Sequence, residues 1–400
     1  MNINTLEQNR GRRLIYLEAI RGIAALSVVL SHLGFTFAPV VQTRLNLPVS
    51  GRVLLATPLS LIINGQFAVR IFFVLSGFVL SLSYFRQKKV QVVTQGASRR
   101  YPRLMLPALA SVMFAWLLLK LGWYWNVEAV ALLQQAPANS FWLLHWFRRD
   151  RSFLDALREG TYGTFFFFSF SPARTLNASL WTMPWEWAGS LIVFSLLALF
   201  GSLQRRFCIY AIVAIAFYAM QWPFLVDFVA GLALCDVFTR FEHVGSEKSL
   251  APLCPAGALV AGLILGGLLT EWPSSNQGFS SYFISCWPTV PAVLIIGGVT
   301  FSRKLQRALE GRVMSFLGKI SFPLYLFHLS IICSAGCGLY VWLRHSAMSH
   351  VFSALISSAL CISILLVLAW GLYFVLELPS LRFARRIGQW LMRGEKLHPK

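Results

Sequence analysis

Charged residues are scarce in this chain, and their scarcity decides its class. Only 12% of the 400 residues are Asp, Glu, Lys or Arg, whereas 57% are hydrophobic and the mean hydropathy is +0.64. A soluble domain carries about twice that charged fraction. The composition therefore excludes an ordinary soluble protein and predicts an all-α polytopic integral membrane protein.

Other absences exclude kinds of site. The seven cysteines include no Cys-x-x-Cys pair and fall mostly in apolar stretches, so we interpret them as buried hydrophobes rather than metal ligands or a disulfide framework. No histidine pair has metal-ligand spacing, and no Gly-x-Ser-x-Gly elbow is present. No repeat of 20–50 residues is visible either. We expect no metal, and one domain over residues 1–400.

Hydrophobic runs that can cross a bilayer recur along the chain. We expect about ten spans, at roughly 14–38, 62–85, 104–121, 179–200, 207–221, 223–238, 255–270, 284–301, 320–341 and 351–376. With the N-terminus in the cytoplasm, 24 of the 35 Lys and Arg residues fall on the inner side and nine on the outer side. This asymmetry places both termini in the cytoplasm and accounts for the net charge of +20 without nucleic acid. The aromatic and basic region 122–178 suits short interfacial helices.

The first span, Leu14 to Ala38, is not a plain anchor, because it contains Glu18, Arg21 and His32. Ionisable groups inside a spanning helix are costly and are functional by default. Ten residues stand between Arg21 and His32, so the two lie on one helix face about 16 Å apart along the axis. Glu18 is three residues before Arg21, where it can hold the guanidinium.

Judged by depth alone, the ionisable residues form two polar layers. The inner layer holds Glu18, Arg21, Arg100 and Arg103, and the outer layer holds His32, Arg70 and Glu186. Arginine forks suit phosphate oxygens, so the inner layer could bind a ligand with several negative charges. In the outer layer His32 could take a proton from a hydroxyl, with Glu186 orienting it or the acceptor.

Structural alternatives stay open for these residues. Arg100 and Arg103 could simply be the basic end of a loop. His32 could be a structural histidine that is hydrogen-bonded to a neighbouring helix, and Arg70 with Glu186 could form a charge pair between helices. The spacing assigns no role to Asp227, Asp236 and His328. A transporter or exporter with an Arg/His/Glu path, or a non-catalytic scaffold, would also explain intramembrane charges.

Five stretches, taken in order, resemble the motifs of the acyltransferase 3 family, the polytopic membrane acyltransferases that modify extracytoplasmic glycans and related acceptors. They are Tyr16 to Ala25 with the Arg21-x10-His32 spacing, Phe72 to Phe78, Arg100-Tyr101-Pro102-Arg103, Ser179 to Glu186, and Leu317 to His328 followed by Glu377-Leu378-Pro379. The chain departs from the family at Arg70, where many members have an acidic residue. It also lacks the fused hydrolase-like domain of some members, which implies a stand-alone enzyme.

The resemblance implies an O-acetyltransferase-type enzyme in a bacterial inner (cytoplasmic) membrane, with acyl-CoA, commonly acetyl-CoA, as cytoplasmic donor. The acceptor would be a hydroxyl of a glycan or related molecule on the other side. His32, Arg21 and Glu186 are the expected catalytic residues, with His32 as general base or acyl carrier, and Arg100, Arg103 and Arg21 are expected to bind the donor. Region 122–178 is the expected acceptor platform.

Overall fold

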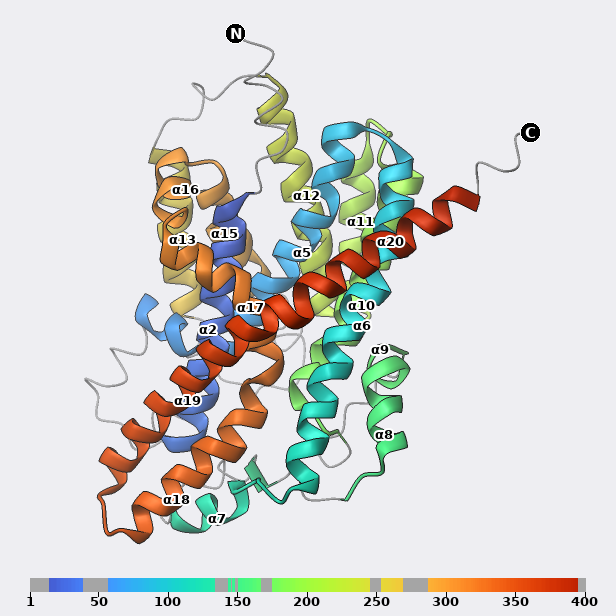
Figure 1. Cartoon of the computed structure of the whole chain (residues 1–400). Coiled ribbons are helices and arrows are strands. Elements are labelled where there is room, and N and C mark those ends of the chain that lie inside the picture. Colours follow the sequence, from blue (N-terminus) through green and yellow to red (C-terminus); the bar gives the residue numbers. More distant parts are fainter. Residues whose placement is uncertain are drawn as a thin grey trace.

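The protein is all-helical throughout the part of the chain that its structure describes. The computed structural model describes residues 14–38, 57–133, 143–144, 146–147, 150–166, 175–244, 253–268 and 287–394, and no strand occurs in these ranges. The long helices run between two ends of a bundle (Figure 1). The start of α2 (Ile15–Phe37) lies near one end, and α7 (Asn126–Leu132) and α18 (Cys337–His345) lie at the other.

The helices follow the expected spans closely. Between residues 57 and 200 they are η1 (Pro58–Ile63), α5 (Gly65–Gln87), α6 (Val90–Lys120), α7, α8 (Phe153–Arg158), the π-helical η3 (Glu159–Gly163), α9 (Thr164–Phe166), η4 (Ala178–Thr182) and α10 (Met183–Phe200). The rest are α11 (Arg206–Ala219), α12 (Pro223–Val244), α13 (Leu253–Leu268), α15 (Thr289–Thr300), α16 (Arg303–Leu309), α17 (Arg312–Ile331), the π-helical η6 (Ile332–Gly336), α18, α19 (His350–Leu372), the π-helical η7 (Tyr373–Glu377) and α20 (Leu378–Gly394).

Six helical stretches in the described ranges are long and apolar enough to cross a membrane. They are Ile15–Phe37, Gly65–Gln87, Val90–Lys120, Ala178–Phe200, Arg312–His345 and His350–Leu391. Three shorter apolar helices, Arg206–Ala219, Cys254–Leu268 and Thr289–Thr300, coincide with further expected spans. These helices, with the low charge of the chain, make the protein an integral membrane protein.

The third helix is longer than the hydropathy predicts. Residues 90–103 were expected to lie in a basic segment before a span at 104, but α6 is continuous from Val90. At 1.5 Å per residue, Arg100 lies about 15 Å along the helix rather than at its mouth. Lys88, in the left-handed region at φ 54°, ends α5 and turns the chain into α6.

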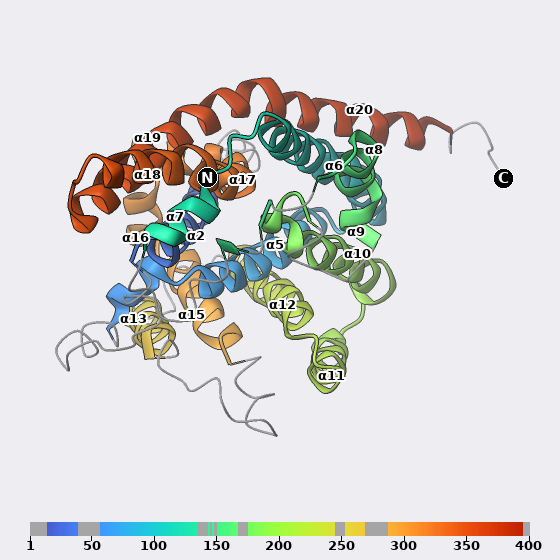
Figure 2. The same ribbon diagram turned by 90° about the horizontal axis from the view of Figure 1, so that it is seen from below.

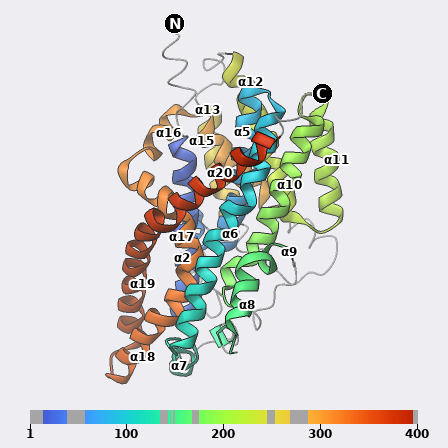
Figure 3. The same cartoon turned by 45° about the vertical axis from the view of Figure 1, so that its right-hand side comes forward.

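The end of the chain is also helical beyond the last span. After α19 the π-helical segment η7 leads into α20, which packs against α6. Seen from below, α19 and α20 follow the edge of the bundle (Figure 2), and a third view shows α20 crossing in front of α6 (Figure 3). α20 lies beyond the last expected span, and its Gly388 packs against the side chain of Arg99 in α6.

Two close helix pairs form the centre of the bundle, and glycines allow both. In α2 and α17, a Cβ on Gly22 would lie 2.5 Å from the carbonyl carbon of Leu317, and one on Gly318 would lie 2.7 Å from the carbonyl oxygen of Glu18. In α5 and α12, Gly77 lies against the backbone of Phe228 and Gly231 against that of Val74. Small residues bring helix backbones together in membranes, and here they fix which side chains of each pair meet.

The described parts of region 122–178 contain short helices, and their place at a membrane interface stays a prediction. Its described parts include α7, α8, η3 and α9, and Trp123 and Trp125 are among its exposed aromatic residues. Arg148, Arg149 and Phe167 lie outside the described residues. α7 packs against α18 at the end of the bundle opposite the start of α2.

Candidate active site

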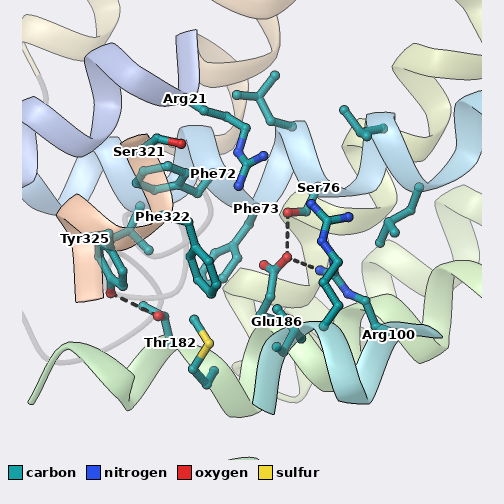
Figure 4. Close-up of a pocket in the computed structure, with 17 residues that line it drawn as sticks. Arg21, Phe72, Phe73, Ser76, Arg100, Thr182, Glu186, Ser321, Phe322 and Tyr325 are labelled. Atoms are coloured by element: carbon teal, nitrogen blue, oxygen red, sulfur yellow. Dashed lines mark hydrogen bonds and ion pairs between the residues drawn. The ribbon is translucent and has the colours of Figure 1, made fainter. Parts of the chain in front are cut away.

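A carboxylate from α10 joins α5 and α6 in the middle of the bundle. Glu186 accepts hydrogen bonds through Oε1 from the Ser76 hydroxyl, at 2.7 Å, and from Nη2 of Arg100. Arg100 also donates through Nε to Ser190 Oγ at 2.7 Å, one turn further along α10. The fork of Arg100 is therefore held by two side chains of α10, Glu186 and Ser190. Figure 4 shows Glu186 between Arg100 and Ser76.

This group lines a cavity between α2, α5, α6, α10 and α17. The cavity has about 840 Å³ of unfilled space, part of it open to solvent. Its polar lining includes Arg21, Arg100, Arg103, Ser76 and Glu186, and most of the remaining wall is apolar. Arg21 points into this space from α2 (Figure 4).

The cavity carries more positive than negative charge. Arg103 lies within electrostatic range of Arg100 and Arg21, and of the carboxylates of Glu186 and Glu377. The cavity lining thus has three guanidinium groups and one carboxylate, Glu186, in a largely apolar surrounding, where charge interactions are stronger than in water. The predicted donor-binding residues Arg21, Arg100 and Arg103 come together, and the cavity suits an anionic group with an apolar extension.

The structure corrects the predicted position of Glu186. The sequence analysis placed Glu186 in an outer layer with Arg70, but Glu186 pairs with Arg100. Two boundaries explain the error: α6 extends 14 residues before the predicted span, which carries Arg100 inward, and α10 begins at Met183 after the short η4. The contacts of Glu186 therefore support a role at the arginine cluster rather than beside His32.

Arg70 belongs to a different buried network. Its Nε lies 3.1 Å from Asp227 Oδ2, and its Nη2 donates to Thr289 Oγ1 at 3.2 Å, while the Thr289 hydroxyl donates to Asp227 Oδ1 at 2.7 Å. These residues join α5, α12 and α15, so Arg70 does form a charge pair between helices, but with Asp227 instead of Glu186. Asp236 likewise binds Arg206, at 2.5 and 2.7 Å.

Tyr325 closes the cavity on the α17 side. Its hydroxyl donates to the carbonyl of Ser179 at 2.8 Å and lies 2.9 Å from the hydroxyl of Thr182. Both partners belong to η4, which Asn177 caps through a hydrogen bond from Ser179 N at 3.1 Å. The rings of Tyr325 and Phe72 form an edge-to-face pair, with their centroids 5.8 Å apart.

Two histidines lie directly beyond Tyr325. The ring of His328, one turn along α17, is 5.9 Å from that of Tyr325 and 4.8 Å from that of His32. Nε2 of His328 is 3.3 Å from Nδ1 of His32. The predicted base therefore adjoins the arginine cavity without lining it, and α2 spans both, with Arg21 at one and His32 at the other.

Sequence reasoning missed several residues of this arrangement. Ser76 and Tyr325 were each inside a quoted motif but had no assigned role, and Ser190 was not considered. His328 was noted as ambiguous. The usable signal for His328 was its ten-residue distance from Gly318, which equals the distance of His32 from Gly22. No group of three or more His, Cys, Asp or Glu side chains in the described ranges could hold a metal ion.

Comparison with known proteins decides the class. The model of a family described as an acyltransferase domain matches residues 14–374. The chain belongs to this acyltransferase family. It is therefore an acyltransferase, and the transporter and scaffold alternatives are set aside.

Three fungal proteins resemble the acyltransferase over most of its length. An O-acetyltransferase of Phomopsis amygdali, PaAT-1, is 24% identical over 383 residues, which is 82% of this chain and 75% of that protein. An acyltransferase of Cochliobolus lunatus is 24% identical, with 82% and 84% coverage, and one of Phoma sp. is 25% identical with the same coverage. No solved structure matches.

Proposed function

We propose that the enzyme transfers an acyl group, acetyl in the first instance, from cytoplasmic acyl-CoA to a hydroxyl of an extracytoplasmic glycan or related acceptor. The observation that carries this proposal is the continuity of two features along α2. An arginine-lined cavity at Arg21 is followed, about three helical turns further on, by the His32 side chain. The name of the Phomopsis relative supports acetyl as the group and oxygen as the acceptor atom.

The donor would bind with its phosphates at Arg21, Arg100 and Arg103. The guanidinium fork binds phosphate oxygens with two parallel hydrogen bonds. The apolar wall, which includes Phe72 and Phe322, suits the pantetheine arm and acyl group. The axial distance of about 16 Å between Arg21 and His32 is compatible with an extended arm that connects a charged head to the thioester.

In the proposed reaction, neutral His32 acts as general base. The acceptor oxygen attacks the thioester carbonyl carbon while its proton passes to His32. The carbon–sulfur bond then breaks, and the proton moves from His32 to the CoA sulfur. A positioned base contributes about 10²–10⁴-fold to such a step. An acyl-histidine intermediate at the same residue is the second version of the mechanism.

The proposal includes a topology. A helix overlaps each of the ten expected spans, and six helical stretches in the described ranges are long and apolar enough to cross a membrane. We propose ten spans in one acyltransferase domain over residues 1–400, with both termini in the cytoplasm. The short helices of region 122–178 then lie on the acceptor side. Because the three relatives are fungal, the bacterial inner membrane is a prediction for cell fractionation to test.

The test is the release of free thiol from acetyl-CoA by the purified full chain in lipid nanodiscs, with mass spectrometry of an added polyol or sugar acceptor. We expect an acetyl ester and CoA in equal amounts, and loss of both in His32→Ala at equal folded yield. His350→Ala serves as a histidine control, because His350 contacts Tyr340 at the start of α19. If His32→Ala keeps native turnover, the proposed mechanism is wrong.

A further inference from the structure

The two histidines are paired by the packing of α2 on α17. Gly22 and Gly318 bring the two helices into backbone contact, and His32 and His328 each follow their glycine by ten residues. The helices run parallel, so this common spacing brings the two rings together. The 3.3 Å contact between them thus follows from the central helix pair rather than from a loop.

Backbone carbonyls determine which ring nitrogens carry the protons. Nδ1 of His32 lies 2.8 Å from the carbonyl oxygen of Val28, and Nδ1 of His328 lies 2.6 Å from that of Tyr325. A carbonyl oxygen only accepts, so each Nδ1 must be the donor, and each neutral ring has its lone pair on Nε2. The lone pair of His328 then faces the Nδ1–H of His32.

Burial distinguishes the two rings. His328 is 1% exposed, whereas His32 is partly exposed. Both nitrogens of His328 are engaged, Nδ1 with Tyr325 and Nε2 with His32. Of the two histidines, His32 is therefore the one that is not fully enclosed.

We propose that His328 is a positioning residue for the base His32. It accepts from the Nδ1–H of His32, sharing that proton with the Val28 carbonyl, and so keeps the Nε2 lone pair of His32 ready for the acceptor hydroxyl. When Nε2 takes the hydroxyl proton, His32 becomes an imidazolium whose Nδ1–H retains two acceptors. His328 neither gains nor loses a proton in the step. A carboxylate orients the histidine of hydrolase triads in this way; here a neutral imidazole does so.

This inference rests on the proposed function, so its test combines kinetics with a measurement that needs no activity. His328→Leu removes the acceptor, and His328→Gln offers its side-chain oxygen in its place. Residues that orient a metal-bound histidine through its other ring nitrogen typically contribute 10–100-fold, and we expect the same range for this pair. We expect His328→Leu to lower kcat by about that factor, with KM for acetyl-CoA changed less than about twofold, and His328→Gln to recover most of the loss. His350→Gln, of a histidine outside the pair, is expected to keep native kcat.

The second measurement is ¹⁵N NMR of histidine-labelled native protein, with His32→Ala and His328→Leu used to assign the signals. Both rings are expected to carry their proton on Nδ1. A proton on Nε2 of either neutral ring would overturn the inference.

The remaining outcomes separate the inference from the proposed function. Equal losses of kcat in His328→Leu and His328→Gln at matched melting temperature would show that His328 acts only through packing, and would overturn the inference. Native kcat in His328→Leu would refute the inference alone. Nδ1–H rings in a native chain that transfers no acyl group would refute the proposed function, and with it the positioning role.

Discussion

Arg100 and Arg103 differ in what they bind within the protein, and this difference predicts opposite effects of their substitution. Arg100 donates to Glu186 and Ser190. Arg103 lines the same cavity, and among the described residues no hydrogen bond of its guanidinium is found. Arg103 is therefore the arginine with more bonding capacity left for a bound phosphate, and Arg100 is the one that holds the site together.

The magnitudes follow from these contacts. A hydrogen bond to a charged group contributes about 1.5–3 kcal/mol, so Arg103→Gln should raise the Kd for CoA by roughly 10- to 150-fold with little change in melting temperature. Arg100→Gln leaves the Glu186 carboxylate, only 12% exposed, without its counter-charge. We expect that variant to lose about 3 kcal/mol of stability.

The assay is calorimetric titration of CoA into purified protein in detergent, with thermal unfolding of the same samples. Arg307→Gln, of an exposed arginine on α16, is the matched control for loss of one positive charge. The Kd of the Arg103→Gln variant should also depend less on salt, since one charge contact is missing. An unchanged Kd for CoA in Arg103→Gln would refute the assignment of the cavity to the donor. An equal loss of CoA affinity in the Arg307→Gln control would refute it as well.

Three further predictions concern stability and are read from thermal unfolding in detergent. Gly22→Ala should destabilise the protein by about 1–3 kcal/mol, because the added Cβ would meet the backbone of α17. The control Gly257→Ala, whose Cβ would have nothing within 4 Å, should be neutral or stabilising. Equal effects of the two substitutions would contradict the close packing. Asp227→Asn should cost about 3–5 kcal/mol of stability, because it leaves Arg70 buried without its charge partner. The double variant Arg70→Met with Asp227→Leu should recover most of this loss. No recovery would contradict the buried ion pair. Burial raises the pKa of the Glu159 carboxyl above its ordinary value of 4.5. The stability of the protein should therefore fall as pH rises from 4.5 through the folded-state pKa. A melting temperature that does not change over this pH range would contradict the prediction.

Hydropathy was enough to predict the long apolar helices, because each of them contains an apolar run. It could not predict that α6 starts at Val90, since the segment before residue 104 is basic and reads as a loop. In the structure that segment is helical, and Gly388 of α20 packs against the side chain of Arg99. The depth of Glu186 in the helix bundle was therefore misjudged, and its partner is Arg100.

The ten-residue spacing of Arg21 and His32 was readable because it lies within one helix. The partner of His32 could not be predicted from the sequence, because it depends on which helix packs against α2. That choice is made by contacts between residues nearly 300 positions apart, such as Gly22 with Gly318. A single sequence shows both glycines without showing that they meet.

The most direct test of the central claim separates donor binding from chemistry in one set of steady-state measurements. Acetyl transfer by the native chain, His32→Ala and Arg103→Gln is followed in nanodiscs over a range of acetyl-CoA concentrations, with CoA binding measured in parallel. The account predicts that His32→Ala loses kcat at least about 100-fold and retains CoA binding, whereas Arg103→Gln raises KM and keeps kcat within a few-fold. Loss of CoA binding in His32→Ala, or loss of kcat alone in Arg103→Gln, would contradict the assignment of these residues to the two ends of one path.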